Sequence, residues 1–389
     1  MTIKPYIIAE EARLVDLRRW FHAHPEASMQ EHETARKIAA ELDSFGVPYQ
    51  LIGDTAIAAT IKGTKPGEGK IVALRADMDA LQMEDLKDTP YASKHPGYCH
   101  ACGHDAHVAA LLVAAKVLQE KRTEFSGEVR LFFQPGEEIG AGARLFLQAG
   151  LLEGVHRVFG VHVTSLLESG EVSLTPGPQN ASCDYFEIEV TGRGTHVSTP
   201  ELGVDALYIA AQIVNNLQSI VSRQTAAGDS VIVGVGTLNA GTQYNIVAEH
   251  ARLEGTTRAF TPDSRAFTNN RVKTIAEETA KLHGGTARVD FKAFASPLIN
   301  DAEVAEEVRA IAAPLVGEEN IITNNQKALM ADDFADFLAE TKGLYALVGA
   351  HDPARPETGI SHHHGLFDID ETALLTCCNL YVDVALAYV

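Results

Sequence analysis

The chain has 389 residues, and its 52 acidic residues against 32 Lys and Arg give a formal net charge of −20. Nucleic acids and anionic membrane surfaces bind proteins through basic patches, so this excess of acid argues against both partners. It leaves open a small anionic substrate, which one local arginine can bind. Hydrophobic residues make up 46% of the chain, enough for a sizeable core in two or three domains.

The cysteine content predicts a reducing compartment. There are five cysteines, an odd number for a disulfide framework, and a chain of this length needs no covalent staples. We therefore expect a cytoplasmic protein, with Cys377 and Cys378 as small core residues of an apolar C-terminal helix. The N-terminus lacks the long apolar segment of a signal peptide, and no apolar run reaches membrane-spanning length.

Hydrophobic spacing predicts an α/β pattern through the first half of the chain. We expect helices over 9–21, 32–45, 108–118 and 141–149, and strands over 57–62, 71–76, 128–134 and 157–163. His22 and His24 lie between the first two helices. They could be metal ligands, but a helix end followed by a proline-ended turn explains them better.

The stretch 98–107 concentrates side chains that bind metals. It contains Cys99, Cys102, His100, His104 and His107 at a predicted junction between loop and helix. Thiolate and imidazole ligands suit a borderline metal such as zinc. A His-rich surface loop is the alternative interpretation of the same residues.

Three predicted strands carry polar side chains at or near their ends. These side chains are Asp79, the pair Glu137 and Glu138, and His162. Two adjacent buried carboxylates repel each other unless a cation or a proton intervenes. The alternative is a solvated helix start, where the helix dipole also favours acids. Because parallel strands with crossover helices end at one sheet edge, we expect these residues to converge with Cys102 and His104.

The pattern changes at residue 184. Strands over 185–190, 231–238, 247–259 and 287–294, with helices over 205–224 and 263–283, give the order βαββαβ. This order predicts a ferredoxin-like α+β domain inserted at 184–294 into a domain formed by 1–183 and 295–389. Helices over 301–313, 331–340 and 369–387 and a strand over 344–349 complete the chain. Three consecutive histidines, 362–364, are candidates for a last ligand.

Eight blocks in this order carry a family signature: 75–81, 100–107, 133–138, 160–162, 192–196, Asn245, 255–258 and 362–371. Together they resemble the amidohydrolase branch of the aminoacylase/carboxypeptidase family of dinuclear metallopeptidases. That branch includes hippurate hydrolases, N-acyl-amino-acid amidohydrolases, N-acetyl-diaminopimelate deacetylases and auxin-conjugate hydrolases. The resemblance implies a metallohydrolase catalytic domain with a mixed, largely parallel sheet, and a dimerisation or lid domain at 184–294. It also implies a homodimer, with a tetramer left open.

The resemblance also implies roles for single residues. Cys102 matches the bridging ligand of two metals, and His104, Glu138 and His162 match terminal ligands. His363, four residues before Phe367, matches the last ligand, with His362 as the alternative. Glu137 matches the catalytic carboxylate, and His196 matches a residue that reaches the partner subunit's site and polarises the substrate carbonyl. Asn245 and Arg258 match substrate-binding residues. Asp79 and Asp105 match residues that support the ligands.

The expected function is metal-dependent hydrolysis of the amide bond of small N-acyl-amino acids such as hippurate or N-acetyl-amino acids. A dipeptidase or carboxypeptidase activity is the alternative, and a non-catalytic metal-binding module is disfavoured because Glu137 is present. The expected cofactors are two divalent ions, zinc first, with manganese, cobalt and nickel open. Gln82, Gly136 and Asp332 depart from the family's usual Pro, Ala and Glu, but none of these changes removes a ligand or the base.

Overall fold

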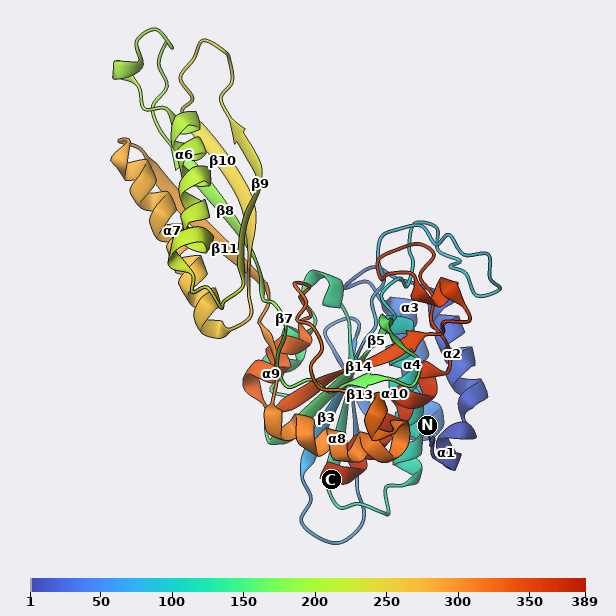
Figure 1. The fold of residues 1–389 in the computed structure, drawn as a ribbon. Coiled ribbons are helices and arrows are strands. Elements are labelled where there is room, and N and C mark those ends of the chain that lie inside the picture. Colours follow the sequence, from blue (N-terminus) through green and yellow to red (C-terminus); the bar gives the residue numbers. More distant parts are fainter. Residues whose placement is uncertain (1) are drawn as a thin grey trace. The chain divides into compact units, whose positions relative to one another are not determined.

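The structure is a computed structural model that describes residues 2–389 (Figure 1). The chain forms two compact units. Unit 1 comprises Met1–Gly177, Asn300–Gln326 and Asp332–Val389, and unit 2 comprises Pro178–Ile299 and Lys327–Ala331. Unit 2 extends a few residues beyond the expected 184–294 on both sides. The strands β7 (Gly177–Asn180) and β12 (Leu298–Asn300) pair there in a small sheet of their own.

Unit 1 contains a sheet in the order β1-β2-β4-β3-β5-β14-β6-β13. Strand β3 pairs in parallel with β4 and β5, and β5 with β14, whereas β2 is antiparallel to β4. This confirms the mixed, largely parallel sheet. The strands are β1 (Tyr49–Ile52), β2 (Ala56–Lys62), β3 (Ile71–Asp77), β4 (Glu128–Gln134), β5 (Val155–Glu168), β6 (Val172–Ser173), β13 (Ile321–Ile322) and β14 (Gly343–His351).

Helices cover the two faces of this sheet (Figure 1). They are α1 (Pro5–Ile8), α2 (Glu11–Ala23), α3 (His32–Phe45), α4 (His104–Glu120), α5 (Ala143–Gln148), α8 (Ala302–Val316), α9 (Phe334–Glu340) and α10 (Ala373–Tyr388). Successive side chains of β4 point to opposite faces of the sheet. Leu131 and Phe133 join the main core with α4 and α10. Phe132, on the other face, packs on Phe146 of α5 and Phe337 of α9. Helix α4 is almost wholly buried, as its apolar sequence predicts.

Several boundaries differ from the sequence prediction for local reasons. The edge strand β1 was not predicted, because its short, half-exposed sequence lacks a buried face. Helix α9 begins at Phe334 rather than 331, since the Asp332 carboxylate accepts the Phe334 N–H and ends the preceding loop. Helix α10 begins at Ala373 rather than 369. It buries Cys377 and Cys378 completely, as expected.

Unit 2 has the predicted βαββαβ order, with an antiparallel sheet ordered β11-β8-β10-β9. Its elements are β8 (Cys183–Thr191), α6 (Ala206–Ser219), β9 (Val231–Ala240), β10 (His250–Ala259), α7 (Pro262–Leu282) and β11 (Thr286–Ala295). Phe186, Ile188 and Val190 of β8 face the core shared with the two helices. The predicted helix 205–224 ends its α-helical part at Ser219 and continues as a π-turn, and β10 starts three residues later than expected.

None of the helices described in residues 2–389 combines the length and the hydrophobicity that crossing a membrane requires.

Candidate metal centre

Three elements of unit 1 position the candidate ligands. Strand β4 ends at Gln134, and Glu137 and Glu138 lie in the short 3-10 turn that follows. His162 lies within β5, and His104 is the first residue of α4. Gly103 precedes α4 with a φ of +95°, and a Cβ there would lie 2.4 Å from a methyl carbon of Val163. Only glycine therefore lets the ligand loop approach β5 this closely.

Cys102 belongs to two groups of potential metal ligands at once. One ligand atom from each of Cys102, His104 and Glu138 lies within 4.8 Å of the others, and the same holds for Cys102, His162 and His362. The Cys102 Sγ lies 3.5 Å from the His162 Nε2. A side chain shared by two such groups occupies the position that a bridging ligand needs.

Hydrogen bonds orient both imidazoles for ligation through Nε2. The His104 Nδ1 donates to the Asp79 carbonyl oxygen at 2.9 Å, and the His162 Nδ1 donates to the Val163 carbonyl oxygen at 2.6 Å. Each bond fixes the tautomer and leaves a lone pair on Nε2. The buried His104 Nε2 has no hydrogen-bond partner, and the buried Glu138 Oε1 faces the His363 Nε2 at 3.3 Å. Unsatisfied buried atoms of this kind are costly unless a cation binds them, so the residues present fit a divalent metal.

Asp79 supports this group from behind. Its Oδ2 accepts the Glu138 N–H at 3.0 Å and the Ser28 hydroxyl at 2.7 Å, while its carbonyl oxygen orients His104. One residue thus fixes two candidate ligands that come from different elements.

His362 and His363 both reach Cys102, in different ways. The His363 Nε2 lies 3.3 Å from the Glu138 Oε1, and bonds to Cys102 and Glu138 raise the pKa of His363 to about 10. His362 forms a candidate ligand group with Cys102 and His162. Its Nδ1 donates to the Cys102 carbonyl oxygen, and its Nε2 accepts the Ser165 N–H. His362 thus belongs to one ligand group of Cys102 and His363 contacts residues of the other, so both are candidates for the last ligand.

Glu137 is a buried acid beside the ligand group. Its Oε2 lies 3.9 Å from the His104 Nε2, and its side chain also approaches Asp332 and Asp333. Burial first, and then the charges of Asp332 and Glu138, raise the pKa of Glu137 well above its ordinary value. A carboxyl whose pKa lies high can both accept and return a proton near neutral pH.

A buried network behind Glu137 was not predicted from the sequence. Arg75 of β3 donates to Asp332 at 3.2 Å and to Asp333 at 2.9 Å, and the Gln134 amide donates to Asp333 at 2.6 Å. An arginine in the middle of the apolar strand 71–76 was the available signal, because such a residue requires buried acidic partners.

Two further histidines of unit 1, His107 and His22, have structural partners. The His107 Nδ1 donates to Asp77 at 2.6 Å and its Nε2 accepts the Val163 N–H, so neither nitrogen remains for a metal. His22 bonds to Asp105 at 2.6 Å, and Arg18 binds the same carboxylate at 2.9 Å. Asp105, predicted to support the ligands, thus joins α4 to α2.

Cys99 lies in a separate buried group with His22 and Asp85. The ammonium of Lys87 lies 2.8 Å from Asp85 and 3.6 Å from the Cys99 Sγ, so this group already contains its own cation. Of the two cysteines in the ligand-rich stretch, only Cys102 contacts the candidate metal centre.

The predicted catalytic His196 and the predicted substrate-binding residues Asn245 and Arg258 lie in unit 2, at two different ends of its sheet. The Val197 N–H donates to the Asn245 carbonyl oxygen at 3.1 Å, so His196 and Asn245 lie on neighbouring segments. Arg258 is eight residues after His250, the first residue of β10, or about 27 Å along an extended strand. Within one chain, Arg258 is therefore remote from His196 and Asn245.

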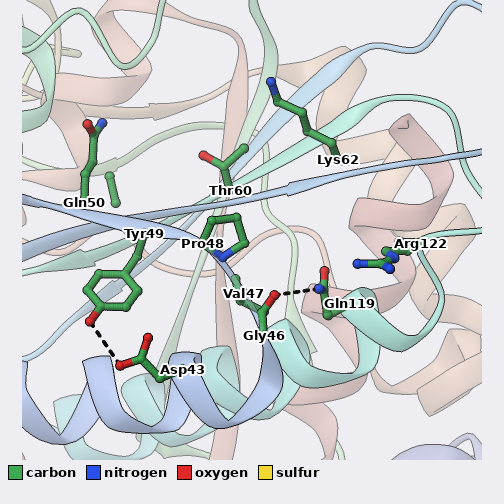
Figure 2. A pocket seen from close by; sticks show the side chains of 11 residues that line it. Asp43, Gly46, Val47, Pro48, Tyr49, Gln50, Thr60, Lys62, Gln119 and Arg122 are labelled. Atoms are coloured by element: carbon green, nitrogen blue, oxygen red, sulfur yellow. Dashed lines mark hydrogen bonds between the residues drawn. The ribbon is translucent and has the colours of Figure 1, made fainter.

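A pocket of about 880 Å³ in unit 1 lies away from these residues (Figure 2). Residues after α3, on β1 and β2 and at the end of α4 line it, among them Tyr49, Lys62 and Gln119. A hydrogen bond from Gln119 to the Gly46 carbonyl oxygen, 2.7 Å long, crosses it (Figure 2). Gln119 is fifteen residues from His104 on the same helix, about 22 Å away. This pocket therefore takes no part in the metal centre.

A mixed α/β fold that gathers cysteine, histidine and glutamate side chains next to a buried acid is typical of a metal-dependent hydrolase. The chain belongs to peptidase family M20/M25/M40, whose model matches residues 73–387. It is 34% identical over 379 residues to the N-acetylcysteine deacetylase of Bacillus subtilis (strain 168), covering 97% of both chains. It is 35% identical over 366 residues to thermostable carboxypeptidase 2 of Saccharolobus solfataricus, covering 93% of this chain and 91% of that one.

A solved structure agrees with the fold. The Bacillus subtilis YXEP protein, described as a dinuclear metal binding peptidase of the M20 family, superimposes with a TM-score of 0.84 at 32% identity over 98% of both chains. The protein is therefore an enzyme, a metal-dependent amidohydrolase of a family that binds two divalent ions and acts on small substrates.

Proposed function

We propose that the enzyme hydrolyses the amide bond of small N-acyl-amino acids to a carboxylic acid and an amino acid. The observation that supports this most strongly is the shared position of Cys102 between two ligand groups, with the buried Glu137 beside one of them. In this proposal Cys102, His104, Glu138, His162 and His363 would hold the two metals, with Cys102 shared between them.

The bound metals would supply a water of lowered pKa and an electrophile for the amide carbonyl. Glu137 accepts the proton of that water at its carboxylate and later donates it to the leaving amine, acting as base and then as acid. Its raised pKa, caused by burial and by neighbouring carboxylates, suits both halves of this exchange. His196 donates a hydrogen bond to the substrate carbonyl oxygen as negative charge develops there.

The same proposal assigns the substrate contacts to two subunits. Asn245 and Arg258 hold the substrate, and Arg258 is suited to a carboxylate because its guanidinium can bind both oxygens. An N-acyl-amino acid is far shorter than the distance along β10 that separates Arg258 from His196 and Asn245. One site can use all three only if two chains contribute to it, which supports a homodimer through unit 2.

The surface of unit 2 offers an interface for such a dimer. Strand β9 is the last strand of its sheet, and it exposes Ile232 and Leu238. Helix α6 next to it exposes Leu207 and Tyr208, 47% and 49% of their surface. An edge strand with exposed apolar neighbours is a template for pairing with a second copy. The mass of the assembly in solution distinguishes such a dimer from a tetramer made of two dimers.

We propose zinc as the native metal, because cysteine, histidine and glutamate are its usual ligands, with manganese, cobalt and nickel as competitors. The five free cysteines support a reducing cytoplasm as the working compartment. Because one relative is named a carboxypeptidase, cleavage of dipeptides or of peptide C-termini is the second candidate activity.

The test is hydrolysis by one preparation, assayed as isolated, after chelation, and after zinc or manganese is restored. The substrates are hippurate, several N-acetyl-amino acids and a set of dipeptides. We expect activity on the N-acyl-amino acids that disappears with the metal and returns with it. Turnover of dipeptides alone would favour the second candidate, and stoichiometric metal without any amide turnover would contradict both.

A further inference from the structure

The turn that carries Glu137 and Glu138 is held by a segment from a distant part of the sequence. Glu31, at the start of α3, is completely buried. Its Oε1 accepts the Gly136 N–H at 2.9 Å and the Met29 N–H at 2.8 Å. Its Oε2 accepts the Thr55 hydroxyl at 3.0 Å. The backbone of the turn is thus tied at Gly136, one residue before the acid proposed as the base.

A second tie acts on the same turn from the same segment. Ser28 donates to the Asp79 carboxylate, and the oxygen that receives this bond also accepts the Glu138 N–H. Residues 28–31 therefore hold both ends of the Gly136–Glu138 turn, directly through Glu31 and indirectly through Asp79.

Backbone conformation and packing show that this contact is tight. Gly136 has a φ of +64°, and a Cβ there would lie 2.7 Å from the Met29 sulfur. Met29 itself has a φ of +64°, and among the described residues only His363 shares a positive φ without being glycine. A non-glycine residue in this conformation stores strain that the surrounding structure must hold. Here the Met29 N–H is held by Glu31.

We propose that Glu31 is a positioning residue, which fixes the Gly136 backbone and thereby sets the directions of the Glu137 and Glu138 side chains. The part of the proposal that concerns Glu137 rests on the proposed function, whereas the part that concerns Glu138 needs only metal binding. Glu31 accepts two N–H bonds at its Oε1 and one hydroxyl bond at its Oε2. The amide oxygen of glutamine can accept the N–H groups of Gly136 and Met29, and its NH2 can donate to the Thr55 hydroxyl instead of accepting from it. Glutamine should therefore replace Glu31, and alanine should not.

The carboxyl already resists ionisation, because burial and then the nearby Asp79 raise the pKa of Glu31 to about 7. Replacing it by a neutral amide therefore costs little charge, which makes Glu31→Gln a matched conservative variant.

The experiment compares Glu31→Ala, Glu31→Gln and Glu26→Ala. Glu26 is the matched control, since its carboxylate accepts the N–H groups of Glu33 and Thr34 in the first turn of α3 and makes no bond to the Gly136–Glu138 turn. The measurements are the affinity for zinc by competition with a chelator, the visible spectrum of the cobalt-substituted protein, kcat and KM, and the melting temperature.

We expect Glu31→Ala to weaken zinc binding or lower kcat about 10- to 100-fold, as for other residues that orient metal ligands, and to change the cobalt spectrum. Glu31→Gln should keep the zinc affinity and kcat within about threefold of the wild type. Glu26→Ala should lower the melting temperature while zinc affinity and kcat stay near wild type.

If Glu31→Ala yields too little folded protein, Gly136→Val provides a second variant, because a branched side chain at this positive φ meets the Met29 sulfur and displaces the same turn. It should reproduce the altered cobalt spectrum with Glu31 intact. The proposal is overturned if Glu31→Ala binds zinc and turns over substrate like the wild type, or if Glu26→Ala loses as much as Glu31→Ala. A wild type that binds metal but cleaves no amide would refute the proposed function, and the zinc and cobalt measurements would still decide the role of Glu31.

Discussion

The Oε2 of Glu137 lies 3.9 Å from the Nε2 of His104, although the two side chains come from different elements of unit 1. His104 is held by Asp79, and the same Asp79 receives the backbone N–H of Glu138. Two candidate ligands, His104 and Glu138, are therefore fixed relative to one another by a single residue, through the backbone carbonyl and the carboxylate of Asp79. We propose metal binding for His104 and Glu138 and proton transfer for Glu137, so a variant of Glu137 should lose only the second.

Replacing Glu137 by glutamine should abolish turnover and leave the metals bound. Loss of a general acid and base costs about 10²- to 10⁴-fold in rate, so kcat should fall by this amount while KM changes little. Metal content is measured on the same sample by atomic emission. Glu138→Gln is the comparison, because it should lose metal as well as activity. Near-normal kcat for Glu137→Gln would show that the base lies elsewhere.

Metal binding should release protons and strengthen as pH rises. Burial, and then the charge of Glu138, raise the pKa of the Cys102 thiol, and bonds to Cys102 and Glu138 raise that of His363 to about 10. Both groups hold protons near neutral pH in the metal-free protein, and ligands must lose them to bind. The apparent enthalpy of zinc binding, measured by calorimetric titration, should differ between two buffers with different ionisation enthalpies, because the buffer takes up the released protons. Identical enthalpies in both buffers would contradict this assignment.

Asp105 should stabilise unit 1 at neutral pH and not in acid. Burial alone would raise its pKa, but Arg18 and His22 hold the pKa of Asp105 well below its ordinary value. A carboxylate with a lowered pKa in the folded state stabilises the fold above its unfolded pKa of about 3.9, and this contribution is lost as pH falls. Asp105→Asn should lower the free energy of unfolding by about 3 kcal/mol at pH 7, because Arg18 loses a buried partner.

Urea unfolding of the chelator-treated protein at several pH values measures this effect. The difference in the free energy of unfolding between Asp105→Asn and the wild type should shrink as the pH falls below about 4. Asp290→Asn is the control, since Asp290 forms an exposed pair with Arg288 and should change little. A pH-independent difference would show that packing, rather than charge, explains the loss.

Two inactive variants should restore activity when they form mixed dimers. If His196 serves the partner's site, a dimer of one His196→Ala chain and one Glu137→Gln chain has one complete site. Random reassembly of equal amounts makes half of the dimers mixed, each with one site of two, so about a quarter of wild-type activity should return. The measurement is kcat after joint refolding, compared with each variant refolded alone. No recovery, with mixed dimers demonstrated by mass, would place His196 outside the partner's site.

The elements of the fold were largely predictable, because they depend on local patterns. The order βαββαβ of unit 2 and the strands that carry or lead to Asp79, Glu138 and His162 follow from hydrophobic periodicity. These three strands, β3, β4 and β5, are parallel neighbours in the sheet of unit 1. The edge strand β1 was not predictable, since its four residues have no buried face. The network of Arg75 with Asp332 and Asp333 joins residues more than 250 positions apart, and no local pattern encodes such a pairing.

The sequence by itself determined which chemistry is available: Cys102, His104, Glu138 and His162 are ligand types, and the order of their blocks identifies the family. Only the tertiary structure decided how these residues are used. It engages both nitrogens of His107, turns Asp105 toward Arg18, and places Glu31 under the turn that bears Glu137. The reason is physical, because a side chain's role depends on which lone pairs and protons its neighbours leave free, and those neighbours are distant in the chain.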